Sequence, residues 1–218
     1  MDILRVDTDQ PERRTLDHAA EAVLRGGVIA FPTDTLYGLG CSLFDVSAVD
    51  MVARLKRRPP SMAVISLIPD AEQAWGLAVA ISPLAERLMK AYWPGPLSII
   101  FHASGLVPEP VQGKGGTIAL RCPKDTLSHA LLGRIGGPVV SSSANLSGQP
   151  PAETAEEVVK YFGNQLDLIL DGGPRRGGLP STLVDVTGPK AKLLRRGALD
   201  VTSVLGDYED LTSPRAGG

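Results

Sequence analysis

Short apolar runs alternate with amphipathic segments along almost the whole chain, and this alternation restricts the folds that the sequence can adopt. The apolar runs predict strands at residues 28–31, 63–68, 97–103, 117–122, 138–143, 167–170, 182–186 and 192–196. Apolar residues at helical spacing predict helices within residues 15–25, 47–58, 84–93, 126–136, 155–163 and 200–206. Strands interleaved with helices indicate an α/β fold in which helices pack on a sheet. The close spacing of the last strands indicates a mixed sheet.

The chain is expected to form one domain. Its 218 residues fit one domain or two small ones, and 43% hydrophobic residues can fill a sizeable core. No repeat, low-complexity linker or break in composition divides the sequence. We therefore expect a single domain over residues 12–205, preceded by a lead-in at 1–11 and followed by a tail at 206–218, in which residues 210–218 are expected to be frayed.

Composition argues against several classes of protein. The net charge is −2 and aromatic residues make up 5%, which gives no support for strong nucleic-acid binding. Cys41 and Cys122 form no Cys-x-x-Cys pair, so we expect reduced thiols rather than a disulfide framework. No apolar run approaches the roughly 18 residues of a membrane helix, and the first residues lack the apolar segment of a signal peptide. These features predict a cytoplasmic protein without a membrane partner.

Residues 31–45, FPTDTLYGLGCSLFD, follow a predicted buried strand and are rich in hydroxyl groups and glycine. Side chains such as those of Asp34 and Thr35 bond to nearby backbone, and Gly38 and Gly40 permit positive φ, so an ordinary turn into a helix would explain the composition. The same residues could instead form the wall of a pocket. The local pattern leaves both interpretations open.

Four further clusters of cations, hydroxyls and glycines follow predicted strands or helices, where ligands gather in open α/β sheets. They are residues 56–59, 141–148, 171–182 and 195–196, and in addition Thr117 and Arg121 lie on one face of a predicted strand. Together they suit an anionic ligand with phosphates, because Lys and Arg charges and the backbone amides of Gly-rich turns bind phosphate groups. Each cluster alone also has a structural explanation, as a helix end, a polar loop, a hairpin or a solvated pair of charges.

Other chemistries find little support in the sequence. His18, His102 and His129 lie outside all of these clusters, and neither a zinc-ligand spacing nor a His-Glu-x-x-His motif occurs. The Gly-Lys-Gly-Gly stretch at 113–116 lacks the spacing of a Walker A loop, and the chain contains no Gly-x-Ser-x-Gly. Metalloprotease, P-loop and serine-hydrolase chemistry are therefore disfavoured.

The sequence resembles the YrdC-like family in five stretches, which occur in the family's order and spacing: PTDTLYGLGC, KRRP, TIALRCP, SSSANLSGQPP and DGGPRRGGLPSTLVDV. The best-known members are threonylcarbamoyl-AMP synthases. The resemblance implies a single α/β domain with a twisted mixed sheet and a deep, positively lined cavity. It implies formation of threonylcarbamoyl-AMP and pyrophosphate from L-threonine, bicarbonate and ATP, with Mg²⁺ accompanying ATP. The product would pass to a tRNA threonylcarbamoyl-transferase complex, and a weak contact with RNA is compatible with this.

The resemblance also implies roles for individual residues. Four would contact threonine, namely Thr35, Arg121, Ser141 and Ser181. Six would contact the nucleotide, namely Lys56, Arg58, Thr117, Ser143, Asn145 and Arg195. Lys56 and Arg58 would act in catalysis by offsetting charge on the phosphates, while Ser143 and Asn145 would also hold the metal. The substrate amine is its own nucleophile, so the reaction needs no histidine.

Three positions depart from the family pattern. Met62, Leu67 and Pro151 stand where members have polar residues that contact substrate or nucleotide. A paralogue that acts on a different carbamoyl-adenylate is therefore an alternative, and an RNA-binding module of the same fold is another. The acidic net charge and the few aromatic residues count against RNA binding.

Overall fold

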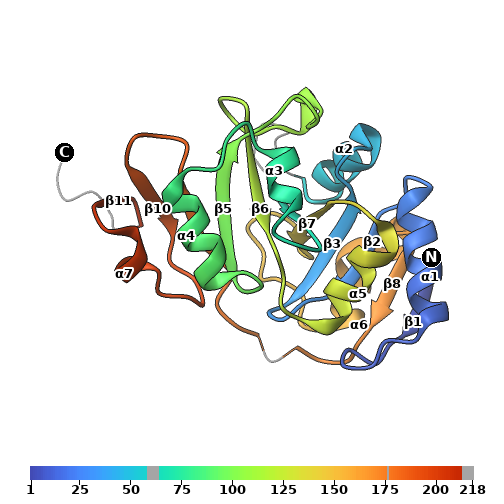
Figure 1. The fold of residues 1–218 in the computed structure, drawn as a ribbon. Coiled ribbons are helices and arrows are strands. Elements are labelled where there is room, and N and C mark those ends of the chain that lie inside the picture. Colours follow the sequence, from blue (N-terminus) through green and yellow to red (C-terminus); the bar gives the residue numbers. More distant parts are fainter. Residues whose placement is uncertain (58–63, 176, 213–218) are drawn as a thin grey trace.

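The computed structural model describes residues 1–57, 64–175 and 177–212 of the chain (Figure 1). Within these residues eleven strands form one mixed sheet, in the order β1-β8-β2-β3-β7-β4-β6-β5-β9-β10-β11. The strands are β1 (Asp2–Arg5), β2 (Ile29–Pro32), β3 (Tyr37–Ser42), β4 (Ile65–Leu67), β5 (Leu97–His102), β6 (Thr117–Arg121), β7 (Val139–Ser143), β8 (Leu168–Asp171), β9 (Thr182–Asp185), β10 (Ala191–Arg195) and β11 (Tyr208–Asp210). The predicted single α/β domain with a twisted mixed sheet is confirmed.

Helices connect most of these strands. They are α1 (Arg13–Leu24), α2 (Val46–Leu55), α3 (Gln73–Leu77), α4 (Pro83–Tyr92), α5 (Thr126–Ile135), α6 (Ala155–Phe162) and α7 (Thr202–Leu205), with short 3₁₀ helices η1 (Glu109–Val111) and η2 (Gly163–Gln165). Side-chain oxygens of Asp45, Ser82, Asp125 and Thr154 cap α2, α4, α5 and α6 by accepting from a backbone N–H in the first turn. Among the helices described, none has the length and apolar character that crossing a membrane requires.

The strands and helices expected from the apolar pattern are all present, with ends shifted by a few residues. The structure adds β1, β3, β11 and α3, which the pattern missed. β1 pairs with β8 and β11 pairs with β10, both in parallel. The sheet therefore extends into both of the segments that were expected to flank the domain.

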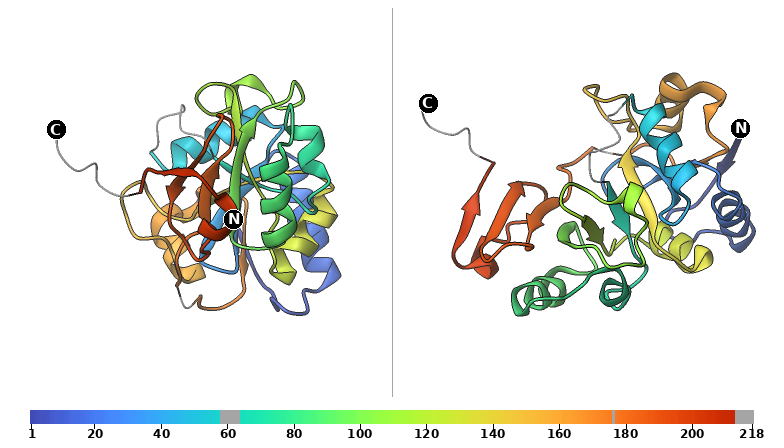
Figure 2. Two further views of the ribbon diagram at one scale, coloured as in Figure 1. Left: turned by 60° about the vertical axis from the view of Figure 1, so that its left-hand side comes forward. Right: turned by 90° about the horizontal axis from the view of Figure 1, so that it is seen from above.

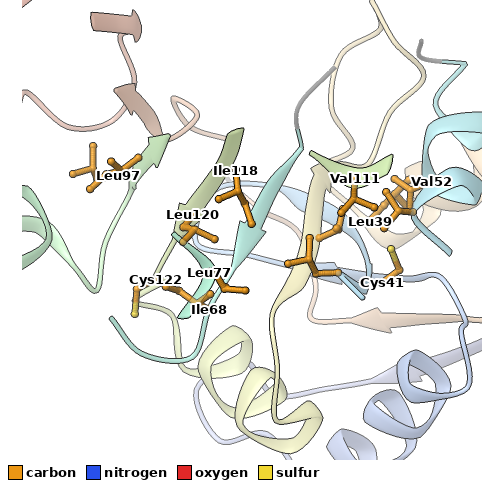
Figure 3. Close-up of a cluster of buried hydrophobic side chains, with 14 of the residues drawn as sticks. Leu39, Cys41, Val52, Ile68, Leu77, Leu97, Val111, Ile118, Leu120 and Cys122 are labelled. Carbon is orange, nitrogen blue, oxygen red and sulfur yellow. The ribbon is translucent and has the colours of Figure 1, made fainter. Parts of the chain in front are cut away.

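One face of the sheet packs against most of the helices. Leu39, Leu120 and Val184 lie on this face, and together with Val52 of α2 and Phe162 of α6 they belong to the larger hydrophobic cluster. Part of this cluster is shown in Figure 3, where side chains of several strands and helices meet. Burial of this face is the main source of the hydrophobic stabilisation of the sheet.

The opposite face, which we call the site face, carries the residues that alternate with this core. Under α1 and α5 the site face is apolar, and Phe31 and Leu67 lie there in a second hydrophobic cluster. Beyond β4, the strand register places Ala119 and Arg121 of β6 and Ser98 of β5 on the same face. Large apolar side chains thus give way to small and polar ones, which leaves room for a ligand.

The sheet curves so that the site face is concave. Arg121, at the end of β6, forms an ion pair with Asp34, in the turn after β2. Strands β3, β7 and β4 lie between β2 and β6. In a flat sheet four steps of about 4.8 Å would separate β2 from β6 by about 19 Å, which is more than the two side chains span. Figure 2 shows from above how α1 and strands β9–β11 lie at opposite ends of this sheet. The deep cavity implied by the resemblance stays a prediction.

Candidate active site

Residues 33–36 form a tight turn between β2 and β3, and Thr33 holds this turn together. Thr33 N donates to Leu36 O at 2.9 Å, and Thr33 Oγ1 donates to the same carbonyl at 2.7 Å. The hydroxyl also accepts from the backbone N–H groups of Thr35 and Leu36, at 3.2 and 3.3 Å. Thr33 therefore accounts for the shape of the turn, and Asp34 takes no part in these bonds.

Of the two interpretations of residues 31–45, an ordinary turn into a helix does not hold beyond Leu36, because Tyr37–Ser42 is strand β3. Neither Gly38 nor Gly40 has a positive φ. A Cβ on Gly40 would lie 2.6 Å from Cε1 of Phe31, and a Cβ on Gly38 would lie 3.2 Å from Oγ of Ser141. Gly40 thus makes room for a core side chain, while Gly38 allows the Ser141 hydroxyl to lie against the backbone of β3.

Arg121 and Arg195 form the cationic end of the site face. Arg121 is buried, and its Nε donates to Gly95 O at 3.0 Å while its Nη2 group pairs with Asp34. Arg195 donates from Nε to the backbone oxygen of Ser181 at 2.9 Å and from Nη2 to the Ser181 hydroxyl at 3.0 Å. Burial, and next the positive charge of Arg121, lower the pKa of Arg195. Ser181, which holds Arg195, has its hydroxyl 2.8 Å from that of Ser98 on β5, the strand beside Arg121 in β6. An anion between the two guanidinium groups would offset their like charges.

Two more side chains complete this end of the site. Ser98 is fully buried, and its hydroxyl lies 2.8 Å from that of Ser181. Asp125 caps α5 by accepting from Ser128 N at 2.8 Å, while its Oδ2 is enclosed and without a hydrogen-bond partner among the residues described. Burial raises the pKa of Asp125, and the neighbouring charge of Asp34 raises it further. Asp125 is therefore an enclosed carboxyl close to the Asp34–Arg121 pair.

Lys56, after α2, and the turn after β7 form a second polar cluster. Lys56 is 4% exposed, and its Nζ donates to the backbone oxygens of Ser143 and Asn145 and to Asn145 Oδ1. The last two contacts measure 3.0 and 2.9 Å. Ser143 Oγ donates to the same Oδ1 at 2.6 Å. Three residues predicted to bind the nucleotide are thus brought together, from positions far apart in the sequence.

The oxygens of this cluster are not arranged for a resident magnesium ion. Asn145 Oδ1 already accepts from the Lys56 ammonium and the Ser143 hydroxyl, so a divalent cation there would lie beside a positive charge. In the described part of the chain, no three His, Cys, Asp or Glu side chains gather so that they could hold a metal. Magnesium ligation by Ser143 and Asn145 thus does not fit these contacts, and Mg²⁺ would enter with its phosphate ligands.

A groove of about 410 Å³ lies at the other end of the site face. Its lining residues come from β5, β6, β9 and the loops beside them: Ile100, His102, Lys114, Gly115, Thr117, Asp185 and Thr187. Asp185 Oδ1 accepts from the backbone N–H and the hydroxyl of Thr187, at 2.8 and 2.6 Å, which fixes this wall. The volume lies within the roughly 300–1,000 Å³ of ligand sites. Thr117 joins the groove to β6, whose other end carries Arg121.

Comparison with known proteins identifies the family. The family model named for Sua5, YciO and YrdC, described as "Telomere recombination", matches residues 21–197, which is most of the chain. The chain belongs to the Sua5/YciO/YrdC family. The resemblance predicted from the sequence is confirmed.

Several members of the Sua5/YciO/YrdC family are similar to this chain. It is 36% identical over 192 residues to the threonylcarbamoyl-AMP synthase of Pyrococcus abyssi, an alignment that covers 87% of this chain and 56% of that protein. It is 37% identical over 171 residues to the threonylcarbamoyl-AMP synthase of Cellvibrio japonicus, which covers 78% of this chain and 90% of that protein. The chain thus spans little more than half the length of the Pyrococcus abyssi relative.

Solved structures of the Sua5/YciO/YrdC family share the fold. P. abyssi Sua5 complexed with L-threonine matches with a TM-score of 0.91 at 34% identity, over 96% of this chain and 62% of that chain. E. coli YciO matches with a TM-score of 0.86 at 31% identity, over 94% of this chain and 100% of that chain. These likenesses cover nearly all of the present chain.

The structure distributes the predicted Sua5/YciO/YrdC site residues over three places. Arg121, Ser181 and Arg195 lie at the cationic end, Lys56, Ser143 and Asn145 lie around the turn after β7, and Thr117 lines the groove. Ser141, two residues before Ser143, faces the same side of the sheet, beside Gly38. Thr35 lies in the turn that carries Asp34, with its hydroxyl 3.2 Å from that of Thr33.

Some predicted positions contribute differently or lie outside the description. Arg58 and Met62 fall outside the described residues. Leu67 pairs with Arg121 across the sheet and packs in the cluster under α1 and α5. Sequence reasoning missed Asp34 as a partner of Arg121, although Asp34 stands at the centre of the first motif. The one feature of the sequence that could have indicated this pairing is the position of the Asp34 carboxylate between the hydroxyls of Thr33 and Thr35.

Proposed function

We propose that this chain forms threonylcarbamoyl-AMP and pyrophosphate from L-threonine, bicarbonate and ATP. The observation that carries the proposal is the placement of Arg121 and Arg195 on one concave face. Ser181 holds Arg195, and its hydroxyl lies 2.8 Å from that of Ser98 on β5, the strand beside Arg121 in β6. The same face also borders the Lys56 cluster. A reaction that joins an amino acid to AMP needs a site for a carboxylate and a site for phosphates. Support comes from relatives named threonylcarbamoyl-AMP synthase and from the similar structure of P. abyssi Sua5 with L-threonine.

Threonine would lie at the cationic end of the site face. Its carboxylate would accept from the planar fork of Arg121, which suits bidentate contact. The hydroxyls of Thr35, Ser141 and Ser181 would contact the polar atoms of the substrate. Arg195 donates to Ser181, a predicted threonine contact, so its guanidinium would lie beside the bound threonine. From there it would contact the α-phosphate of ATP.

ATP would extend from the Lys56 cluster toward Thr117. Lys56, Ser143 and Asn145 would face the phosphates, together with Arg58, which the family pattern adds. The groove at Thr117 would receive the nucleoside, because it adjoins the site face and has the volume of a ligand site. Mg²⁺ would arrive with ATP, held by phosphate oxygens and water.

The reaction needs alignment and charge compensation rather than a covalent intermediate. The threonine amine adds to CO₂ formed from bicarbonate and loses a proton, which gives a carbamate. A carbamate oxygen then attacks the α-phosphorus, and the bond from that phosphorus to the bridging oxygen breaks, so that pyrophosphate leaves. Arg195 and Lys56 would offset charge on the α-phosphate and on the leaving group. The product would be handed to an enzyme that transfers the threonylcarbamoyl group to tRNA.

A substrate-omission assay of the purified chain tests this proposal. With Mg-ATP, L-threonine and bicarbonate, the chain should release pyrophosphate and form an acyl-adenylate in the absence of RNA. Omission of either threonine or bicarbonate should reduce release to background. Pyrophosphate release that does not depend on threonine would contradict the proposed reaction, and tight RNA binding without turnover would favour an RNA-binding module instead.

A further inference from the structure

Asp34 has no task in the reaction proposed above, although its carboxylate lies in the site. It pairs with Nη2 of Arg121, whose side chain is 7% exposed, while the side chain of Asp34 is 25% exposed. Gly95 O holds Arg121 through Nε, so Asp34 is not the only group that orients the guanidinium. A carboxylate beside an arginine that binds the substrate carboxylate would compete with the substrate unless it had a use of its own.

The turn that carries Asp34 does not depend on its side chain. Asp7, Asp185 and Asp210 each accept from a backbone N–H two residues further along their own turns, which is the common use of aspartate in turns. In the turn of residues 33–36 the hydroxyl of Thr33 accepts those bonds instead. The side chain of Asp34 thus pairs with Arg121 across the concave face and does not stabilise its own turn.

The charges around Arg121 suit a ligand that carries both signs. Arg121 and Arg195 offer two guanidinium groups, and Arg195 forms no ion pair within the described part of the chain. Asp34 is a partly exposed carboxylate beside them, whereas Asp125 caps α5 and has an enclosed Oδ2. An α-amino acid carries its ammonium and carboxylate groups on one carbon. A substrate carboxylate between the two arginines therefore brings the ammonium group next to Asp34.

We propose that Asp34 binds the α-ammonium group of the amino-acid substrate and makes the site selective for amino acids over carboxylic acids of the same shape. This rests on the proposed function, which places an amino-acid carboxylate at Arg121. On binding, the substrate carboxylate shares the guanidinium, and Asp34 accepts from the ammonium group. A ligand without the amine leaves Asp34 facing a like charge, which is unfavourable.

Calorimetric titration of the full chain with two ligands tests this proposal. The ligands are L-threonine and 3-hydroxybutyrate, which lacks the amine. The wild-type chain should prefer L-threonine by about tenfold or more, the usual effect of a charge-assisted hydrogen bond. Asp34→Asn keeps the shape of the side chain and removes its charge. It should lower the affinity for L-threonine and leave the affinity for 3-hydroxybutyrate unchanged, which reduces the preference to below about threefold. Asp7→Asn, an exposed turn aspartate, is the matched control and should keep the wild-type preference.

Two outcomes would contradict the expectation, and they differ in what they overturn. An Asp34→Asn chain that keeps the wild-type preference overturns the proposal. This outcome includes an equal loss of affinity for both ligands, because Asp34 would then only position Arg121. A wild-type chain that binds neither ligand overturns the proposed function, and the assignment of Asp34 with it. Should thermal unfolding show that Asp34→Asn does not fold, Asp34→Ser provides the same comparison.

Discussion

Replacement of Lys56 by methionine would show whether the buried ammonium group stabilises the turn after β7. Lys56 is 4% exposed, so water does not screen its contacts. Methionine has a similar length and no donor. Among the described residues, two of the three oxygens that accept from Lys56 Nζ keep another donor, because Ser143 O accepts from Asn145 N at 2.9 Å and Asn145 Oδ1 accepts from Ser143 Oγ at 2.6 Å. Asn145 O would lose its hydrogen bond from Lys56, and no other donor to this oxygen is present among the described residues.

The magnitude follows from this count of oxygens. A buried acceptor without a partner costs about 1–3 kcal/mol, while removal of a buried charge offsets part of the remaining losses. We expect Lys56→Met to lower the free energy of unfolding by about 2 kcal/mol. For a chain of this size each kcal/mol shifts Tm by roughly 2–4 °C, so Tm should fall by about 4–8 °C.

Scanning calorimetry in the absence of ligands measures this shift. Lys90→Met, on the exposed side of α4, is the control and should change Tm by less than about 1 °C. ATP titration of the same variants separates the two effects of Lys56, because phosphate binding and turn stability are read independently. If ATP affinity falls while Tm stays within about 1 °C of wild type, the contacts of Lys56 do not stabilise the turn and the reasoning is refuted.

Two further substitutions probe the site face. Arg121→Ala should weaken L-threonine binding by about tenfold or more, because it removes a charged partner of the carboxylate, and should leave ATP affinity within about threefold; calorimetry with each ligand checks this, and the reverse pattern would exchange the two assignments. Gly40→Ala should destabilise the fold by about 1–3 kcal/mol, since its Cβ would lie 2.6 Å from Phe31 Cε1; urea unfolding measures it, and a neutral result would mean that Phe31 moves aside without cost.

The apolar pattern predicted most of the sheet but not β3, and the reason is physical. Tyr37, Leu39 and Cys41 face the hydrophobic core, while Gly38 and Gly40 alternate with them on the site face. This alternation has the period of a strand, yet glycines next to a Thr-Asp-Thr sequence are typical of a turn. Packing against Phe31 and Ser141 decides in favour of the strand, and these neighbours are set by topology rather than by local sequence.

Site contacts were beyond the reach of local sequence for the same reason. Arg121 and Asp34 are 87 residues apart, and Lys56 and the Asn145 side chain are 89 residues apart. The residue types and their places after strands indicated an anionic ligand. Which cation meets which oxygen depends on strand order and on curvature, and neither follows from motif spacing. Only the structure therefore shows that Arg121 and Arg195 form the cationic end of the site face while Lys56 belongs to a separate cluster.

Curvature also explains why small residues gather on the site face. A concave surface offers each side chain less room than a convex one, so large residues on both sides of the bend would collide. Gly38, Gly40 and Ser141 occupy neighbouring strands on this face, and Ala119 and Ser98 lie on it in β6 and β5. Strand β4, between β7 and β6, instead places Ile65 and Leu67 on this face, where they pack under α1 and α5. The opposite face carries large side chains such as Leu39 and Leu120. The small residues on either side of β4 leave space over the site face, and Asp34 meets Arg121 across this face, so the residues that line it also make room for a ligand.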